Sequence, residues 1–134
     1  MTDDKFDRLG PLLSAIGAEV AADLGGNPDG AHLYVEVGDR WISVNLFRNE
    51  ADVVRNYDHG PELTDAIWKV WEVENPDRKM RWSVMEYEVK GTKFDAQFRY
   101  PDEVDVETYD DRREIALKKR FGDKPVVYPP PPKQ

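Results

Sequence analysis

The chain has 134 residues, of which 27 are acidic and 19 basic, and its formal net charge at neutral pH is −8. This length favours one domain with one core. The negative charge disfavours nucleic acid and anionic membranes as partners, because both are negative themselves. The chain has no cysteine, which excludes disulfides and thiolate metal sites. Since no stretch predicts a signal peptide or a membrane span, we expect a cytoplasmic protein with no membrane partner.

Apolar residues recur at helical spacing over residues 4–25 and predict an amphipathic helix. Gly10 and Pro11 lie inside this pattern, so the helix either kinks there or begins at Pro11. The pair Gly25 and Gly26 predicts its end. The apolar stripe consists of Phe6, Leu9, Leu13, Ile16, Val20 and Leu24.

The next segments alternate between strand and helix patterns. Residues 31–47 have a period of two on both sides of a Gly38-Asp39 turn, which predicts a first hairpin. Residues 48–60 are polar and rich in turn formers, so we expect mostly loop. A second helix is predicted from Pro61 to about residue 75, where an Asn-Pro pair stops it.

The hairpin over residues 80–101 is the feature around which the rest of the chain is organised. Its second strand has one apolar face, with Phe94 and Phe98, and one polar face, with Asp95 and Arg99. Its first strand changes face midway. Either a β-bulge shifts the register near Val84, or Trp82 lies on the open face of the sheet.

The last third of the chain combines charge with proline. An acidic run over residues 102–111 leads into a third helix, predicted from about Glu107 to Phe121. Residues 123–134 hold a run of prolines and predict a flexible polyproline II tail. We therefore expect a single α+β domain over residues 1–122, of order α-β-β-α-β-β-α. Its two hairpins would form a four-stranded antiparallel sheet with helices on one face.

Catalytic chemistry has little support in the sequence. His32 and His59 lack the spacing of a metal site or a catalytic dyad. The serines lack a nucleophile motif, and the acidic run lacks the central glycine of a calcium loop. We therefore expect no enzymatic activity, no cofactor and no metal. A small hydrolase that uses a carboxylate with His59 is the enzymatic alternative.

Binding to another protein fits the composition better. Aromatic residues on an open sheet face are typical of an interaction surface. The acidic run has two interpretations: a solvated helix cap, or a negative patch that docks a basic partner. The candidate partner-binding residues are Tyr34, Glu36, Trp41, Trp82, Glu86, Glu88, Asp95, Asp102, Glu103, Asp105, Asp110 and Asp111.

Two segments carry a family resemblance: RWSVMEYEVKGTKFDAQFRYPDE and TYDDRREIALKKRF. Their pattern is a tryptophan early in a strand, a turn ending in Lys-Phe, a strand closing on an aromatic with acids, and an acidic turn into Arg-Arg-Glu. In this pattern the chain resembles the YezG-like family of bacterial immunity proteins. The matching residues are Trp82, Lys93, Phe94, Tyr100, Asp102, Asp111, Arg112, Arg113 and Glu114. The family often has an aromatic residue soon after Arg-Arg-Glu, where this chain has Ile115, Ala116 and Leu117.

The resemblance implies an antitoxin that binds a cognate toxin domain, often a nuclease, and blocks it stoichiometrically. An acidic protein could achieve this by covering a basic nucleic-acid cleft. The alternative is a non-enzymatic module that forms homodimers or larger oligomers through an edge strand or the open sheet face.

Overall fold

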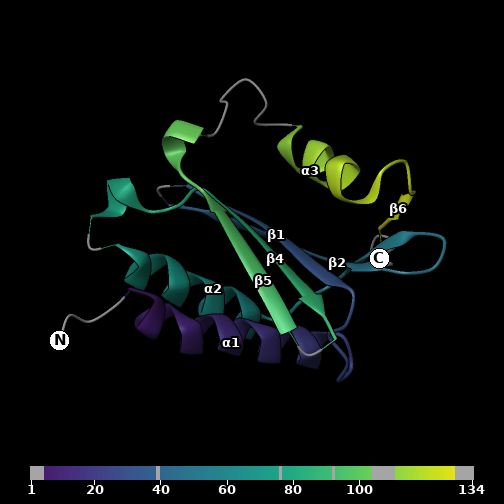
Figure 1. Cartoon of the computed structure of the whole chain (residues 1–134), viewed down its shortest axis with the longest axis horizontal. Helices are drawn as coiled ribbons and strands as arrows, with labels where there is room; N and C mark the ends of the chain where they lie inside the picture. Colours follow the sequence, from purple (N-terminus) through teal and green to yellow (C-terminus); the bar gives the residue numbers. More distant parts are fainter. Residues whose placement is uncertain (1–4, 39, 76, 92, 104–110, 129–134) are drawn as a thin grey trace, which may run out of the picture.

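The computed structural model describes residues 5–38, 40–75, 77–91, 93–103 and 111–128. Three α-helices, two short 3₁₀ helices and one sheet occupy these residues (Figure 1). The helices are α1 (Lys5–Asp23), α2 (Pro61–Glu74), α3 (Arg112–Phe121), η1 (Arg78–Met80) and η2 (Pro101–Glu103). The strands are β1 (Ala31–Val37), β2 (Ile42–Asn49), β3 (Val54–Tyr57), β4 (Val84–Lys90), β5 (Lys93–Arg99) and β6 (Val126–Val127).

The sheet has six strands in the order β5-β4-β1-β2-β3-β6. All neighbours are antiparallel except β3 and β6, which are parallel, so the sheet is mixed. The predicted four-stranded antiparallel sheet is therefore wrong. Strand β3 lies in the segment predicted as loop, where the buried Val54 pairs with Asn49 of β2. Strand β6 lies in the predicted tail and has only two residues, too few for a periodic signal.

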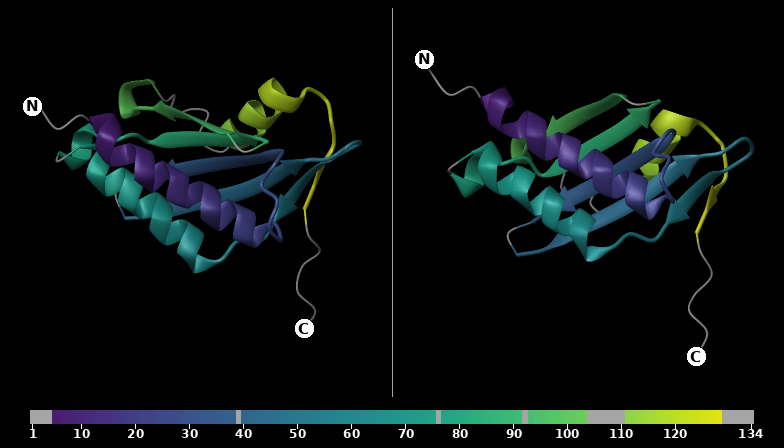
Figure 2. Two further views of the ribbon diagram at one scale, coloured as in Figure 1. Left: turned by 60° about the horizontal axis from the view of Figure 1, so that its bottom comes forward. Right: turned by 90° about the horizontal axis from the view of Figure 1, so that it is seen from below.

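Helices cover both faces of the sheet, not one as predicted. Helices α1 and α2 pack side by side on one face, and α3 lies across the other (Figure 2). Only Ala116 and Leu117 of α3 are buried, and they meet Tyr34, Phe47 and Val84 of the sheet. Because most residues of α3 are charged, its short apolar patch did not indicate which face of the sheet the helix would cover.

The larger core lies between the sheet and the helices α1 and α2. Strand residues such as Leu33 and Met85 and helix residues such as Ile67 are completely buried there. Helix α1 runs through Pro11 rather than starting at it. The Tyr87 hydroxyl donates a hydrogen bond to the Leu13 carbonyl, 2.8 Å away. Burial raises the pKa of Tyr87, so the hydroxyl remains a donor at neutral pH.

Trp82 belongs to this core and is only 1% exposed. The chain bends at Ser83, just before β4 begins, so Trp82 and Val84 lie on opposite faces of the sheet. The Trp71 indole donates a hydrogen bond to the Trp82 carbonyl at 3.0 Å. The pairing of β4 with β5 continues without a break from Val84 onward. The expectation of an open-face Trp82 is therefore wrong. The Ser83 amide donates to the Arg99 carbonyl at 2.8 Å, and Arg99 is also the partner of Val84, so two residues of this chain segment oppose one of β5, as in the predicted bulge near Val84.

The segment after α3 lies along the sheet as far as residue 128. Strand β6 pairs with β3, and the Val54 amide donates to the Pro125 carbonyl at 2.8 Å. The Lys124 ammonium donates to the side chain of Asn49 at 2.5 Å. Residues 129–134, which hold the proline run, lie outside the described residues. None of the described helices is both long and apolar enough to cross a membrane.

Candidate functional site

The sheet face beneath α3 is polar. The pairing of β1 with β4 places Glu88 beside His32 and Glu86 beside Tyr34. Strand β5 adds Asp95 beside Glu88, and further along it adds Gln97 and Arg99. A helix that covers such a face must supply partners for its charges, because a buried carboxylate without a partner is costly.

Helix α3 supplies these partners through its arginines. The Arg112 guanidinium lies 3.1 Å from the Glu36 carboxylate, and the side chains of both are mostly buried. At the other end of the helix Arg120 pairs with Glu88. Burial raises the pKa of Glu36, and the charge of Arg112 partly offsets that rise. Ion pairs therefore hold both ends of α3 to the sheet.

Glu86 is the most strongly perturbed acid among the described residues. It accepts hydrogen bonds from His32 Nε2 at 3.1 Å and from Arg99 Nη2 at 2.7 Å. Burial alone would raise its pKa, but these hydrogen bonds and the Arg99 charge outweigh it and lower the pKa to about 2. Glu86 is thus a fixed negative charge, and it holds Arg99 in place.

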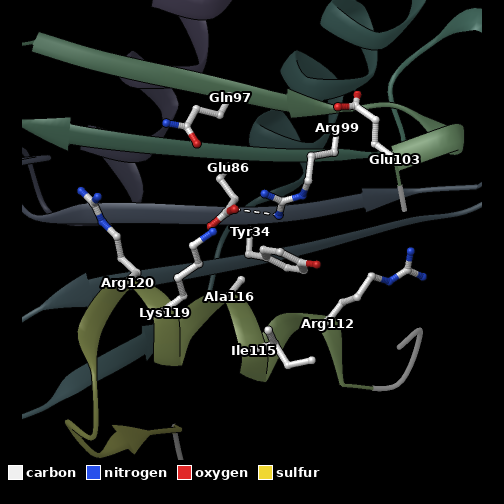
Figure 3. A pocket seen from close by; sticks show the side chains of 10 residues that line it. All are labelled: Tyr34, Glu86, Gln97, Arg99, Glu103, Arg112, Ile115, Ala116, Lys119 and Arg120. Carbon is white, nitrogen blue, oxygen red and sulfur yellow. Dashed lines mark hydrogen bonds and ion pairs between the residues drawn. The ribbon is translucent and has the colours of Figure 1, made fainter. Parts of the chain in front are cut away.

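A cavity of about 480 Å³ opens between α3 and strands β1, β4 and β5 (Figure 3). Tyr34 and Ala116 line its apolar part. The charged side chains in its wall come from β4, β5, η2 and α3, and cations outnumber carboxylates. They are Arg99, Arg112, Lys119 and Arg120 on the one hand and Glu86 and Glu103 on the other.

A second candidate site is the surface at one end of the sheet, where the β1–β2 turn, η1 and η2 come together (Figure 1). We call it the end surface and define it by Trp41, Met80, Pro101, Asp102 and Glu103. Trp41 is 40% exposed and Met80 is 59% exposed. Large apolar side chains at such exposure are typical of interaction sites when acids or other polar groups surround them.

A groove of about 590 Å³ crosses the end surface between η1 and η2. Met80, Tyr100 and Pro101 form its apolar part, and the Tyr100 hydroxyl donates a hydrogen bond to Glu74 at its side. Its charged lining consists of three carboxylates, Glu74, Asp102 and Glu103, and one cation, Lys79. The groove therefore combines an apolar base with a predominantly negative rim.

The structure divides the predicted partner-binding residues into three groups. Tyr34 and Trp82 are buried, so the expectation that they lie on an open aromatic face is wrong. Glu36, Glu86 and Glu88 each face a cation at or near α3. The exposed ones are Trp41, Asp95, Asp102, Glu103 and Asp111, whereas Asp105 and Asp110 lie outside the described residues.

The two histidines lie in different surroundings. The two ring nitrogens of His59 lie 3.3 Å and 3.2 Å from the carbonyl oxygens of Gly60 and Val44. The His32 ring is buried against Phe121 and Glu86. Within the described ranges, no three His, Asp or Glu side chains are grouped closely enough to hold a metal ion.

Several residues of these sites were missed at the level of sequence. Met80 lies in a 3₁₀ helix of three residues, which is too short to give a sequence pattern. The cations Arg99 and Lys119 lie in segments whose charge pattern is typical of a solvent-exposed surface. The excess of basic residues on α3 in an acidic chain was the one signal that could have indicated an internal electrostatic interface.

In comparisons with known proteins, no protein-family model and no curated protein matched the chain. The resemblance to YezG-like immunity proteins therefore rests on the residues quoted for it above.

Proposed function

We propose that the chain is an immunity protein that binds a toxin domain through the end surface and blocks it stoichiometrically. The partner would be a basic domain of the nuclease type, met in the cytoplasm. The observation that carries this proposal is the groove between η1 and η2, in which an exposed methionine lies among carboxylates. The family resemblance supplies the class of partner.

The apolar base of the groove would provide most of the binding energy. Interfaces depend on a few side chains that become buried in well-packed pockets, with polar groups around them. Met80 is suited to such a role because its flexible thioether adapts to a partner surface. Trp41, at the same end of the sheet but outside the groove lining, would offer a further exposed apolar side chain.

Charge would select the partner and speed its capture. The net charge of −8 and the excess of carboxylates in the groove favour a basic surface over an acidic one. A nuclease cleft is basic because it binds phosphates. An acidic protein seated across that cleft would exclude the nucleic acid without any chemical step.

The test is to express the toxin-type domain encoded beside this chain's gene and to measure binding and growth rescue. We expect a one-to-one complex, in which Met80→Ser weakens binding by about tenfold or more, since Met80 would be an anchor. Ile115→Ser is the matched control, because Ile115 is similarly exposed (52%) but lies on α3, outside the groove.

Charge is tested with a second matched pair. Asp102→Lys should slow association, whereas Asp52→Lys should leave it nearly unchanged, because Asp52 is exposed in the β2–β3 turn and does not line the groove. Failure of any toxin-type neighbour to bind would contradict the proposed function. If each control variant impaired toxin binding as much as its partner variant does, the end surface would not be the interface.

A second candidate function is homo-oligomerisation through β5. This strand ends the sheet, and within the described residues no strand pairs with its outer side. An unpaired edge is a template for another strand. Light scattering after size exclusion separates the two functions, since immunity through the end surface requires no dimer and this alternative predicts one.

A further inference from the structure

The cavity between α3 and the sheet has the composition of a ligand site, and Glu103 is the one lining residue that it shares with the groove between η1 and η2. Its cations come from two elements distant in sequence: Arg99 from β5, and Lys119 with its neighbours from α3. Figure 3 shows these side chains arranged around the ring of Tyr34. The chain as a whole is negatively charged, so its composition does not predict this concentration of cations around one cavity.

The cations differ in how far their charge is already neutralised. Arg112 and Arg120 pair with Glu36 and Glu88. Arg99 uses one guanidinium nitrogen for Glu86, and within the described part of the chain its other nitrogens form no side-chain hydrogen bond. Lys119 has no ion-pair partner among the described residues, although it lines the cavity. Lys119 thus offers an unpaired charge, and Arg99, whose charge Glu86 already offsets, offers further N–H donors.

Tyr34 adds a weakly paired polar group to the same cavity. The residue is 1% exposed, and its hydroxyl lies beside the Glu36 carboxylate, in a looser geometry than that of an ordinary hydrogen bond. Burial, with the Glu36 charge, raises the pKa of Tyr34 to about 12, so the hydroxyl keeps its proton. A buried hydroxyl that is only weakly paired gains free energy when a ligand offers it a better acceptor.

Two carboxylates also line the cavity and limit what it can hold. Glu86 is committed to His32 and Arg99. Glu103 accepts a hydrogen bond from the Tyr100 amide at 3.0 Å. A ligand must therefore place its negative group near Lys119 and Arg99 and its remaining atoms against the apolar side chains of Ile115 and Ala116.

We infer that this cavity binds a small organic oxyanion, with the phosphate or carboxylate group between Lys119 and Arg99 and an apolar body against Ile115. Phosphate and carboxylate share the chemistry that matters here: several acceptor oxygens matched to guanidinium and ammonium donors. Tyr34 would donate one further hydrogen bond from within the cavity wall.

The test is a titration of the full chain with phenyl phosphate, inorganic phosphate and benzoate, followed through the NMR signals of the Ile115 methyl groups. We expect saturable shifts with at least one probe, and the preferred probe identifies the charged group. Lys119→Gln should weaken that binding by about tenfold, because one charge-assisted hydrogen bond is lost. Tyr34→Phe should weaken it by roughly threefold to tenfold.

Lys118→Gln is the matched control. It removes the same charge from the adjacent residue, which is exposed, lies 3.9 Å from Asp123 and does not line the cavity. The absence of saturable shifts with all three probes would overturn the inference. Equal weakening by Lys118→Gln and Lys119→Gln would do so too, because it would indicate general attraction to a charged helix. Unchanged thermal unfolding of both variants shows that each remains folded.

Discussion

The two sides of the sheet are built from different interactions. Beneath α1 and α2, completely buried apolar side chains such as Leu33, Ile67 and Met85 form one continuous core. Beneath α3, only a small apolar cluster forms, and charged pairs such as Arg112 with Glu36 hold the helix in place. The first side resembles an ordinary protein interior, whereas the second resembles an interface between two proteins.

This difference separates stability from recognition. Burial of apolar surface is the main favourable contribution to folding, so the α1–α2 side should set the free energy of unfolding. Partly exposed ion pairs contribute less, but they fix geometry and leave cations and carboxylates beside an open cavity. The α3 side should therefore tolerate substitution better and be the first part of the chain to open.

The largest expected loss of stability comes from the core beneath α1 and α2. Trp82→Ala removes a 1% exposed side chain and should lower the free energy of unfolding by about 3 to 5 kcal/mol. Urea denaturation measures this loss. Trp41→Ala is the control, because Trp41 is 40% exposed and should cost well under half as much. Similar losses from both tryptophans would contradict the placement of Trp82.

A fall in pH should lower the stability of the fold through Glu86. Its pKa is lowered from 4.5 to about 2 in the folded chain, so its stabilising contribution is present above pH 4.5 and is lost as the pH falls towards 2. Glu36, whose pKa is raised, acts in the opposite direction. Between about pH 6 and about pH 3, the natural chain should lose about 2 kcal/mol that Glu86→Gln does not lose. Parallel pH profiles for the two proteins would rule out this role of Glu86.

The ion pair at the start of α3 should have a smaller effect. Arg112→Gln leaves the mostly buried Glu36 carboxylate without this partner and should cost about 1 to 2 kcal/mol, less than for a fully buried pair. Lys118→Gln is again the control, since its pair with Asp123 is almost entirely exposed, and it should cost less than about 0.5 kcal/mol. Thermal denaturation at low and high salt distinguishes the two, and equal costs would show that Arg112 does not anchor the helix.

Long periodic segments were predictable from the sequence, and short or charge-held ones were not. The helices α1 and α2 and both hairpins were expected close to their observed bounds, because their apolar periodicity extends over many residues. Strand β3 has four residues and β6 has two, and both find their hydrogen-bond partners on a neighbouring strand that is distant from the local pattern.

The candidate sites were predictable only in part. The acids Asp102 and Glu103 were expected at a binding surface and do lie exposed at the groove. The change of face in the first strand of the second hairpin was expected from its pattern, but Trp82 was placed among the binding residues, whereas it lies in the core beneath α1 and α2. The cavity depends on which face of the sheet α3 covers, and that is decided by the small apolar patch of Ala116 and Leu117 together with the ion pairs of Arg112 and Arg120.

Native-state hydrogen exchange tests the division between the two sides most directly. If apolar burial stabilises one side and ion pairs the other, the amides of α3 should exchange through local opening, at a free energy well below that of global unfolding. Those of α2 should exchange only with global unfolding. Protection of α3 equal to that of α2, unchanged by high salt, would contradict the account.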